Sequence, residues 1–521
     1  MNFPKTAILI LPILAVYARA EIRTNELFSD NMMLRQNSAR IWGTCEPNAK
    51  ITAQIGGLET DFAANGKGEW SAEIETPKGS FEPLELRQSE NGKLSKTIKN
   101  VLVGEVWIAG GQSNLDFKLA NTDGAQKYID GATPRNVRYF RQHATNRHIF
   151  SAAGLGSRPE SGFAKGAEWV LPAPQNAAEL NAVPYIFAVE RSAEIGMPVG
   201  IVYTGVPGTC MASWVSRETY EKSDAFAEDR ATRQKRIENY DYNKERKIFD
   251  ENVKTYPARV AKAKAEGKTP PPAWTVAPFL APWPDSPDMW WTPSMLFNLR
   301  VNPLRSYAAS GIVWYQGEGD TGGDTFAENV SGGDAFAAKF ECLIGEWRKH
   351  FGSPDLPFLF VQLPSFGAST DWTKARAAQE RVARKLENTA MVCSIDTGDK
   401  YDIHPHDKIP IGKRLAAAAD TIGKKIFPQV GGVGFDGSRA TAQFETPNKI
   451  ECRGNCRGFE VLTNGKWSAA NAEFGGGEVK IESENGKRID GVRYLYKNWA
   501  KPDACLFDQN GYPVPPFEIL R

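Results

Sequence analysis

Two short motifs, far apart in the sequence, carry side chains of the kinds that hydrolytic enzymes use. Ser113 follows an apolar segment in the string GGQSN (residues 110–114), where glycines let backbone N–H groups converge near a hydroxyl. His404 lies in the string YDIHP (residues 401–405), two residues after Asp402. A serine nucleophile needs a base that takes its proton, an acid that orients the base, and donors for the oxyanion. Ser113, His404 and Asp402 therefore form a candidate catalytic set.

A third motif supplies a candidate donor. Gln316 ends the apolar segment GIVWY (residues 311–315), and a side-chain amide at the end of a buried strand is placed to donate into the crevice where ligands of α/β sheets bind. Each motif alone is weak, because serines after glycines often begin helices. The chain also lacks the G-x-S-x-G elbow of α/β-hydrolases, since Gln112 and Asn114 flank Ser113.

A metal site is the alternative for the histidine-rich segment. Four side chains there offer nitrogen and oxygen ligands, namely Asp402, His404, His406 and Asp407. Pro405 separates the two histidines, and no further ligand cluster follows nearby, so we favour acid–base chemistry and expect neither a metal nor an organic cofactor.

The sequence around these motifs predicts one α/β region. From residue 101 to 427, apolar strands alternate with helical stretches, which indicates a mostly parallel sheet covered by helices. The expected strands are 105–109, 200–203, 311–315, 358–362 and 390–396. Turn signals at short intervals predict a β domain at 21–100 and a second β-rich region at 428–521.

An insertion at 222–291 interrupts the α/β region. Its first half is dense in charges of both signs with helical spacing, which predicts a solvated helical hairpin rather than a binding patch. Its second half is rich in proline and in tryptophan, and two roles remain open: the indoles could stack on sugar rings, or they could pin a loop to the protein body. These tryptophans are Trp274, Trp283, Trp290 and Trp291.

The first twenty residues have the layout of a secretory signal peptide. Lys5 precedes an apolar stretch from Ala7 to Ala18, and Ala18-Arg19-Ala20 is a small-x-small cleavage site. The stretch is shorter than the roughly 20 residues that a membrane span needs. We therefore expect cleavage of residues 1–20 and a secreted or periplasmic protein.

Composition and cysteine spacing limit the number of domains, the kinds of partner and the roles of the cysteines. The 521 residues, 41% of them hydrophobic, are typical of a globular protein of about three domains. Sixty-three Lys and Arg balance 62 Asp and Glu, so we expect neither a nucleic-acid nor a membrane partner. Cys452 and Cys456 could close a small disulfide loop. A zinc knuckle would need a second pair, and only the distant Cys505 is available.

Taken together, the three motifs resemble the signature set of the sialate O-acetylesterase family, in the SGNH-hydrolase superfamily with its bacterial acetylxylan-esterase relatives. The likeness covers nearly the whole mature chain, from NMMLRQ (residues 31–36) through FLFVQL (358–363) to PPF (515–517). It implies a three-layer α/β domain with a parallel sheet, flanked by β-rich regions. It also implies an enzyme that removes acetyl groups from an O-acetylated glycan or sialic acid.

The resemblance assigns roles to individual residues. Ser113 would be the nucleophile, His404 the general base and Asp402 the orienting acid. The N–H groups of Ser113 and Gly208 and the side-chain amide of Gln316 would bind the oxyanion. Substrate contacts would fall on Gln112, Glu318, Arg376 and Gln379, the last two with a structural role as an equal alternative.

Three departures from the family pattern matter. Val206-Pro207-Gly208 stands where Trp-Gly-Gly is usual, and Gly317-Glu318-Gly319 where Gly-Glu-Ser is usual, which puts the identity of the sugar in doubt. In many SGNH enzymes the acid lies three residues before the histidine, and Tyr401 has that position here. A Ser–His dyad is therefore the alternative to a triad.

Two other functions stay open on the sequence. One is an esterase for acetylated xylan or another polysaccharide. The other, from a different class, is a non-catalytic carbohydrate-binding protein on the same scaffold. The joint presence of Ser113, Gln316 and His404 favours an enzyme, because a binding protein has no use for a paired nucleophile and base. The oligomeric state is left open.

Overall fold

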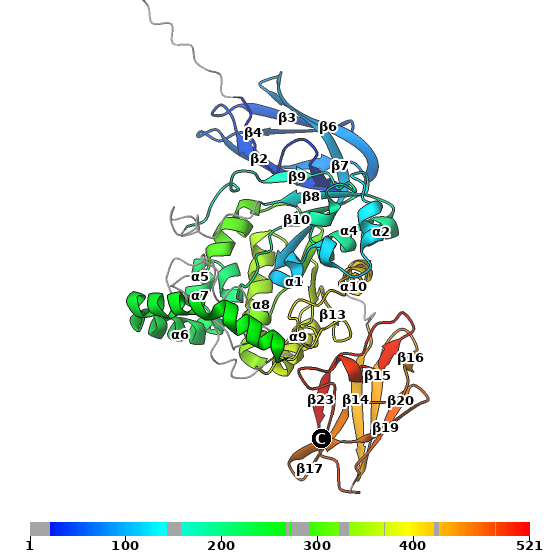
Figure 1. Ribbon diagram of the computed structural model, residues 1–521. Helices are drawn as coiled ribbons and strands as arrows, with labels where there is room; N and C mark the ends of the chain where they lie inside the picture. The colour runs from blue at the N-terminus through cyan, green and yellow to red at the C-terminus, as the bar shows by residue number, and fades with distance from the viewer. Residues whose placement is uncertain are drawn as a thin grey trace, which may run out of the picture.

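Figure 1 shows three parts stacked along the long axis of the computed structural model: an N-terminal β part, a central α/β part and a C-terminal β part. The structure describes residues 21–142, 158–266, 271, 292–321, 333–368, 370–420, 422, 427–484 and 486–521. The predicted signal peptide and the four tryptophans of the insertion lie outside these residues. No helix within the described ranges is long and apolar enough to cross a membrane.

The central sheet confirms the predicted fold class. Its strands run in the order β13-β12-β11-β7-β10-β8-β9, and every neighbouring pair is parallel except the last. All residues of β10 and β11 are buried, as expected for strands covered on both faces. The strands are β7 (Lys93–Gly111), β8 (Val137–Arg141), β9 (Glu168–Val170), β10 (Val199–Tyr203), β11 (Gly311–Tyr315), β12 (Phe358–Val361) and β13 (Thr389–Val392).

Helices cover both faces of this sheet. On one face, α4 (Ala182–Ile195) packs with α10 (Ile409–Asp420) in a single apolar cluster. On the other, α8 (Gly333–His350) and α9 (Thr373–Lys385) pack over β11 and β12. The apolar residues of α8 recur at helical spacing, and the last of them, Trp347, meets Trp314 of β11 at a ring distance of 5.3 Å. The short helices are α1 (Ser113–Asp116), α2 (Gln126–Asp130) and α5 (Arg217–Lys222).

Strand β7 belongs to both the N-terminal part and the central sheet. Its first half pairs with β6 (Ser80–Glu90), and its second half is the middle strand of the parallel sheet. The boundary expected at residues 100 and 101 therefore falls inside a continuous 19-residue strand, and one apolar core runs through both parts. The other N-terminal strands are β1 (Met33–Arg35), β2 (Asn37–Thr44), β3 (Lys50–Ile55), β4 (Leu58–Ala63) and β5 (Glu69–Thr76).

The C-terminal part begins at Gln429, next to the boundary expected from the sequence. Two four-stranded sheets, β14-β15-β20-β19 and β18-β17-β21-β23, pack around a common apolar core, and β16 pairs with β22 beside them. The strands are β14 (Gln429–Asp436), β15 (Arg439–Glu445), β16 (Ile450–Cys452), β17 (Phe459–Thr463), β18 (Lys466–Ala469), β19 (Asn471–Gly475), β20 (Glu478–Glu482), β21 (Gly491–Tyr494), β22 (Leu506–Asp508) and β23 (Phe517–Leu520).

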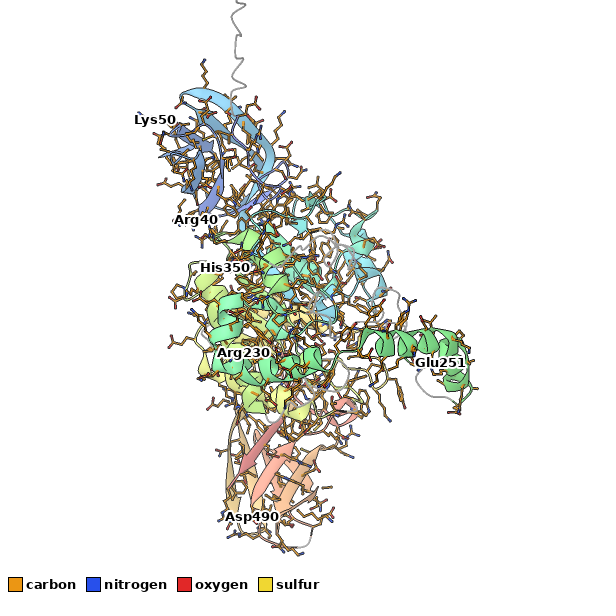
Figure 2. The ribbon with its side chains drawn as sticks, turned by 90° about the vertical axis from the view of Figure 1, so that its left-hand side faces the viewer. Arg40, Lys50, Arg230, Glu251, His350 and Asp490 are labelled. Atoms are coloured by element: carbon orange, nitrogen blue, oxygen red, sulfur yellow. The ribbon has the colours of Figure 1, made fainter. Side chains whose placement is uncertain are left out.

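The charged half of the insertion folds into two helices, α6 (Ala227–Glu238) and α7 (Tyr242–Ala265). Figure 2 shows them projecting from the body, with Arg230 close to the central part and Glu251 near the far end. Ion pairs between residues one turn apart stabilise α7, for example the exposed pair of Arg246 and Asp250, whose Nε and Oδ2 atoms are 3.0 Å apart.

Candidate active site

The sheet topology brings the candidate residues to one edge. Ser113 follows β7, Gly208 lies in the loop after β10, and Gln316 directly follows β11. His404 lies in the loop between β13 and α10. Because these strands are parallel, their carboxyl ends share the edge at which open α/β sheets bind ligands.

A hydrogen bond joins the serine loop to the histidine loop. Asn114 Nδ2 donates to the carbonyl oxygen of Ile403 at 3.0 Å, and the chain neighbours of these two residues are Ser113 and His404. Close by, the ring of His406 packs edge-on against that of Phe117 at 5.3 Å. Ser113 is half-buried and the His404 side chain is 39% exposed, so both can be reached from solvent.

Gly111 allows the serine loop to lie directly against the end of β11. Its φ is 139°, and a Cβ at this position would lie 2.2 Å from the carbonyl oxygen of Tyr315. The next residue, Gln112, donates its N–H to that same carbonyl at 2.9 Å. Only glycine tolerates this approach, so the position of Ser113 depends on it.

The Gln112 side chain holds the loop that follows β11 through its carbonyl oxygen. Its Oε1 accepts the N–H groups of Gly319 at 3.1 Å and Gly317 at 3.4 Å, and the residue is 3% exposed. This contact uses Oε1 alone, so the expected substrate contact of Gln112 stays a prediction for its Nε2.

Asp402 lies between two imidazoles. Its Oδ1 accepts the backbone N–H of His404 at 2.8 Å and lies 3.8 Å from Nδ1 of the same residue. Its Oδ2 lies 3.8 Å from Nε2 of His406. The carboxylate thus fixes the turn that carries His404 and faces its imidazole at a distance beyond that of a hydrogen bond.

His404 is in the state that a general base needs. Burial lowers its pKa, the negative charge of Asp402 opposes this, and the positive charges of Lys408 and His406 act in the same direction as burial. The imidazole is therefore neutral at neutral pH and can accept a proton.

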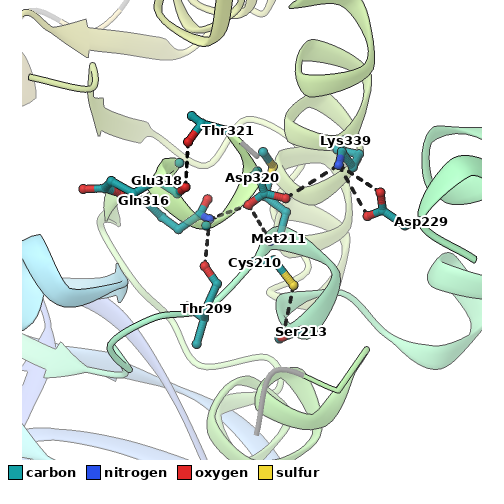
Figure 3. A network of polar contacts seen from close by, with 12 residues as sticks. Thr209, Cys210, Met211, Ser213, Asp229, Gln316, Glu318, Asp320, Thr321 and Lys339 are labelled. Carbon is teal, nitrogen blue, oxygen red and sulfur yellow. Dashed lines mark hydrogen bonds and ion pairs between the residues drawn. The ribbon is translucent and has the colours of Figure 1, made fainter. Parts of the chain in front are cut away.

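Gln316 does not hold its amide in the expected orientation. Its Nε2 donates to Asp320 Oδ2 at 2.6 Å and to the carbonyl of Thr209 at 3.1 Å, as Figure 3 shows. A primary amide nitrogen has two hydrogens, and both are used here, so the expected donation of Gln316 to an oxyanion is not what the structure shows. The side chain instead ties the loop after β10, which contains Gly208, to the end of β11.

The carboxylate that holds Gln316 is part of a buried ionic network (Figure 3). Asp320 also accepts the N–H of Met211 at 2.9 Å and lies 3.7 Å from Nζ of Lys339, which pairs with Asp229 at 3.1 Å. Burial opposes the charge of Lys339, but Asp320 and Asp229 together raise its pKa above the ordinary value. The network fixes the loops on which Gly208 and Gln316 lie.

Arg376 and Gln379 do not line the site. Arg376 is fully buried in α9, and its guanidinium donates to the carbonyls of Lys497 at 2.5 Å and Pro364 at 3.1 Å. Gln379 is 1% exposed, and its Oε1 accepts the N–H of Leu363 at 2.9 Å. These contacts support the structural role that was the alternative to substrate binding: Arg376 joins the central part to the C-terminal part, and Gln379 fastens α9 to β12.

A buried polar group beneath Ser113 was not predicted from the sequence. Asn114 Nδ2 also donates to Glu318 Oε1 at 2.5 Å, and Asn114 Oδ1 accepts from Lys408 Nζ at 2.5 Å. Asn114 and Lys408 are fully buried, and Glu318 is 9% exposed. Glu318 belongs to this group through Oε1, and its predicted substrate contact stays a prediction. Its Oε2 is a buried acceptor with no partner among the described residues.

The charges of this group are strongly perturbed. Burial lowers the pKa of Lys408 to about 7, against the opposing effect of Glu318 and two aspartates. Burial also raises the pKa of Glu318, while the hydrogen bond from Asn114 and the charge of Lys408 act in the opposite direction. Perturbed charges in a ligand-binding crevice are typical of functional sites. The signal in the sequence was a lysine four residues after His404.

Comparisons with known proteins show similarity to carbohydrate esterases. The family model for "carbohydrate esterase, sialic acid-specific acetylesterase" matches residues 288–421, which include Gln316 and His404. The chain is 25% identical to the sialate O-acetylesterase of Mus musculus, over 81% of this chain and 76% of that protein. It is 25% identical to the enzyme of Rattus norvegicus, over 94% and 93% of the two chains.

A solved structure shares the fold. A carbohydrate acetylesterase from Xanthomonas citri matches with a TM-score of 0.74 at 24% identity, over 96% of this chain and 99% of that chain. The fold and the relatives define the protein as an esterase, a hydrolase of the carbohydrate-esterase class. Within that class, the chain is similar to the sialate O-acetylesterases.

The structural role of Arg376 leads to a first prediction. Arg376→Met removes the donors of several buried carbonyls, each of which costs about 1–3 kcal/mol when left unpaired. We expect thermal unfolding at a temperature several degrees lower, with an unchanged KM for an acetylated sugar. Calorimetry and steady-state kinetics measure both. Arg381→Met, an exposed arginine on the same helix, is the control. A raised KM with unchanged stability would restore the substrate contact.

Proposed function

We propose that the protein is a secreted carbohydrate O-acetylesterase that releases acetate from O-acetylated sugars through an acetyl-enzyme on Ser113. The observation that carries this proposal is the bond from Asn114 to the carbonyl of Ile403, which holds the serine loop and the histidine loop side by side. The family supplies the acetylated sugar as substrate. The N-terminal segment, with Lys5 before an apolar stretch, supports export.

The reaction follows from the placement of the two loops. Ser113 Oγ attacks the acetyl carbonyl while His404 takes its proton, and the N–H groups of Ser113 and Gly208 donate to the oxyanion. Collapse of the intermediate breaks the ester bond, and His404 returns the proton to the departing sugar hydroxyl. A water then gives its proton to His404 and attacks the acetyl-enzyme, which frees acetate and Ser113.

Asp402 acts in this scheme mainly through the backbone and through its charge. It fixes the turn of His404 by accepting its N–H, and at 3.8 Å from Nδ1 its charge stabilises the imidazolium that forms in each step. The proposal is therefore a Ser–His pair with a nearby carboxylate, between the dyad and the triad of the sequence analysis.

Sialic acid is the sugar that the relatives favour, since the matching enzymes of mouse and rat are named sialate O-acetylesterases. Acetylated xylan or another polysaccharide is the second candidate, because Pro207 and Gly319 depart from the family pattern near the proposed oxyanion site. Acetate release from acetylated sialic acids, acetylated xylo-oligosaccharides and acetylated mannan tests the choice. Sialic acid is excluded if only the polysaccharide fragments release acetate.

The nucleophile is tested by Ser113→Ala. We expect hydrolysis of p-nitrophenyl acetate to fall at least about 10³-fold, because the acetyl-enzyme cannot form. The melting temperature stays the same, and Ser71→Ala, on the exposed face of β5, retains full activity. Undiminished hydrolysis by Ser113→Ala would remove the assignment. Labelling of the unmodified protein with an organophosphonate distinguishes an enzyme from a binding protein, because only an enzyme forms a covalent adduct at Ser113.

The base is tested by the pH profile. Because the pKa of His404 is lowered by burial, we expect kcat/KM to rise with pH and to level off with a midpoint below about 6.5, the ordinary value for histidine. Initial rates measured between about pH 4 and pH 8 give this midpoint. A flat profile, or a midpoint above the ordinary histidine value, contradicts His404 as a base in this environment.

Lys408 is tested by its effect on that midpoint. Its positive charge is one cause of the lowered pKa of His404, so Lys408→Met should move the midpoint to higher pH. It should also lower kcat, because Asn114 loses a partner. Lys413→Met, an exposed lysine on α10, is the matched control. A lower kcat with an unmoved midpoint would reduce Lys408 to a purely structural role.

A further inference from the structure

Three cysteines that are far apart in the sequence converge in the C-terminal part. Cys452 ends β16, and Cys505 immediately precedes β22, its antiparallel partner. Cys456 returns to the same place after a turn at Gly454, whose φ is 78°. The three sulfur atoms all lie within 4.8 Å of one another. The fold thus supplies the third ligand that the Cys452–Cys456 pair lacks in the sequence.

None of these sulfurs is joined to another by a disulfide, so the small disulfide loop expected from the sequence is not formed in the structure. A disulfide would use two of the three sulfurs and leave the third beside it. A single ligand that binds all three sulfurs accounts for their convergence, whereas a disulfide accounts for only two of them.

The surroundings of Cys505 suit a thiolate. Its Sγ accepts the N–H of Arg457 at 3.3 Å. The hydroxyl oxygen of the buried Tyr494 accepts the N–H groups of Cys505 and Leu506, both at 3.1 Å, and lies 3.8 Å from the same sulfur. Because the hydroxyl oxygen accepts these two N–H groups, the hydroxyl hydrogen of Tyr494 is free to point toward the sulfur of Cys505. Hydrogen bonds to ligating sulfurs are common around metal centres and tune them.

The charges nearby complete the site. Three thiolates and one divalent cation carry a net charge of −1. Arg453 lies on the turn that separates Cys452 from Cys456, and Arg457 directly follows Cys456. The guanidinium of Arg453 stacks on the ring of Phe507 at 4.0 Å and lies 3.0 Å from Glu451, which holds it beside β16 and β22. Arg453 is paired with Glu451, so the positive charge of Arg457 is the one that acts on the sulfur of Cys452.

We propose that Cys452, Cys456 and Cys505 bind a thiophilic metal ion, with Zn²⁺ as the expected ion. Thiolates about 2.3 Å from a tetrahedral zinc lie about 3.8 Å apart, which the observed separation of the three sulfurs accommodates. Cys452 and Cys456 are half-buried while Cys505 is fully buried, so the fourth position opens toward solvent and takes a water or an external ligand.

The proposed ion would join β16 and β22 to the turn that leads into β17. The described contacts of this turn are few: Arg453 N–H donates to the carbonyl of Cys505 at 2.8 Å, and Cys505 Sγ accepts from Arg457. Because a metal that binds only the folded state stabilises it by mass action, zinc should raise the stability of the C-terminal part. The site is separate from the candidate active site, so it does not depend on the proposed esterase function.

The test uses the full-length protein, reduced and then dialysed against Zn²⁺. We expect one zinc per chain by mass spectrometry and a higher melting temperature with zinc than with a chelator. Cys452→Ser and Cys505→Ser should each weaken zinc binding at least about 100-fold and abolish the zinc-dependent rise in melting temperature. Cys342→Ser, in α8 of the central part, is the matched control and should bind as the unmodified protein does.

Two results would overturn the proposal. The first is equal zinc content in the unmodified protein and in Cys452→Ser, the variant at the more exposed ligand, which avoids the folding defect that a change at the buried Cys505 could cause. The second is a disulfide among the three cysteines in protein purified without reductant and digested after alkylation, which would assign the cluster to covalent cross-linking.

Discussion

The side chain of Asn114 is the constraint on which the rest of the site depends. It is fully buried, so each of its polar atoms needs a partner. Those partners come from two other loops: Ile403 and Lys408 lie between β13 and α10, and Glu318 follows β11. One amide therefore sets the distance between the loops that carry the proposed nucleophile and base. No change in one loop can be made without disturbing the other two.

A second constraint comes from strand β7. This strand, which ends two residues before Ser113, begins in the N-terminal part, where it pairs with β6, and continues as the middle strand of the central sheet. Ser113 is thus anchored by a strand with partners along almost its whole length, and Gly111 lets its last turn cross against β11. A serine held by such a strand keeps its position without help from the substrate, which is the preorganisation that acyl transfer requires.

Much of this arrangement could be predicted from the sequence, because it depends on local pattern. The five expected strands correspond to parts of β7, β10, β11, β12 and β13, whose apolar runs are continuous. Strand β8 was missed, since it contains Arg138, which is 4% exposed and looks like a surface residue in the sequence. The position of Ser113 after a buried strand followed from the apolar segment before it.

What the sequence left open has a common physical cause. Gln112, Arg376 and Gln379 belong to polar motifs, and from sequence a glutamine that binds a sugar looks the same as one that satisfies buried backbone groups. Only tertiary structure reveals burial, which decides between the two roles. The same holds for Lys408, because lysines are almost never fully buried unless paired. Cys505 was left apart from Cys452 because sequence distance hides an antiparallel pairing.

The buried contacts that hold the loops of Ser113 and His404 are distinct from the positions at which the chain departs from the family pattern. A Cβ at Gly319 would lie 2.4 Å from the carbonyl oxygen of Thr209, so the serine that the family pattern has at this position would push against the loop after β10. Pro207 lies in that same loop and replaces a glycine of the pattern. The two departures therefore concern the same pair of neighbouring loops, while Asn114 holds the loop of Ser113 against that of His404 and Gln112 holds it against the loop after β11. Such an arrangement lets the preferred sugar change without altering the positions of the groups that would break the ester bond.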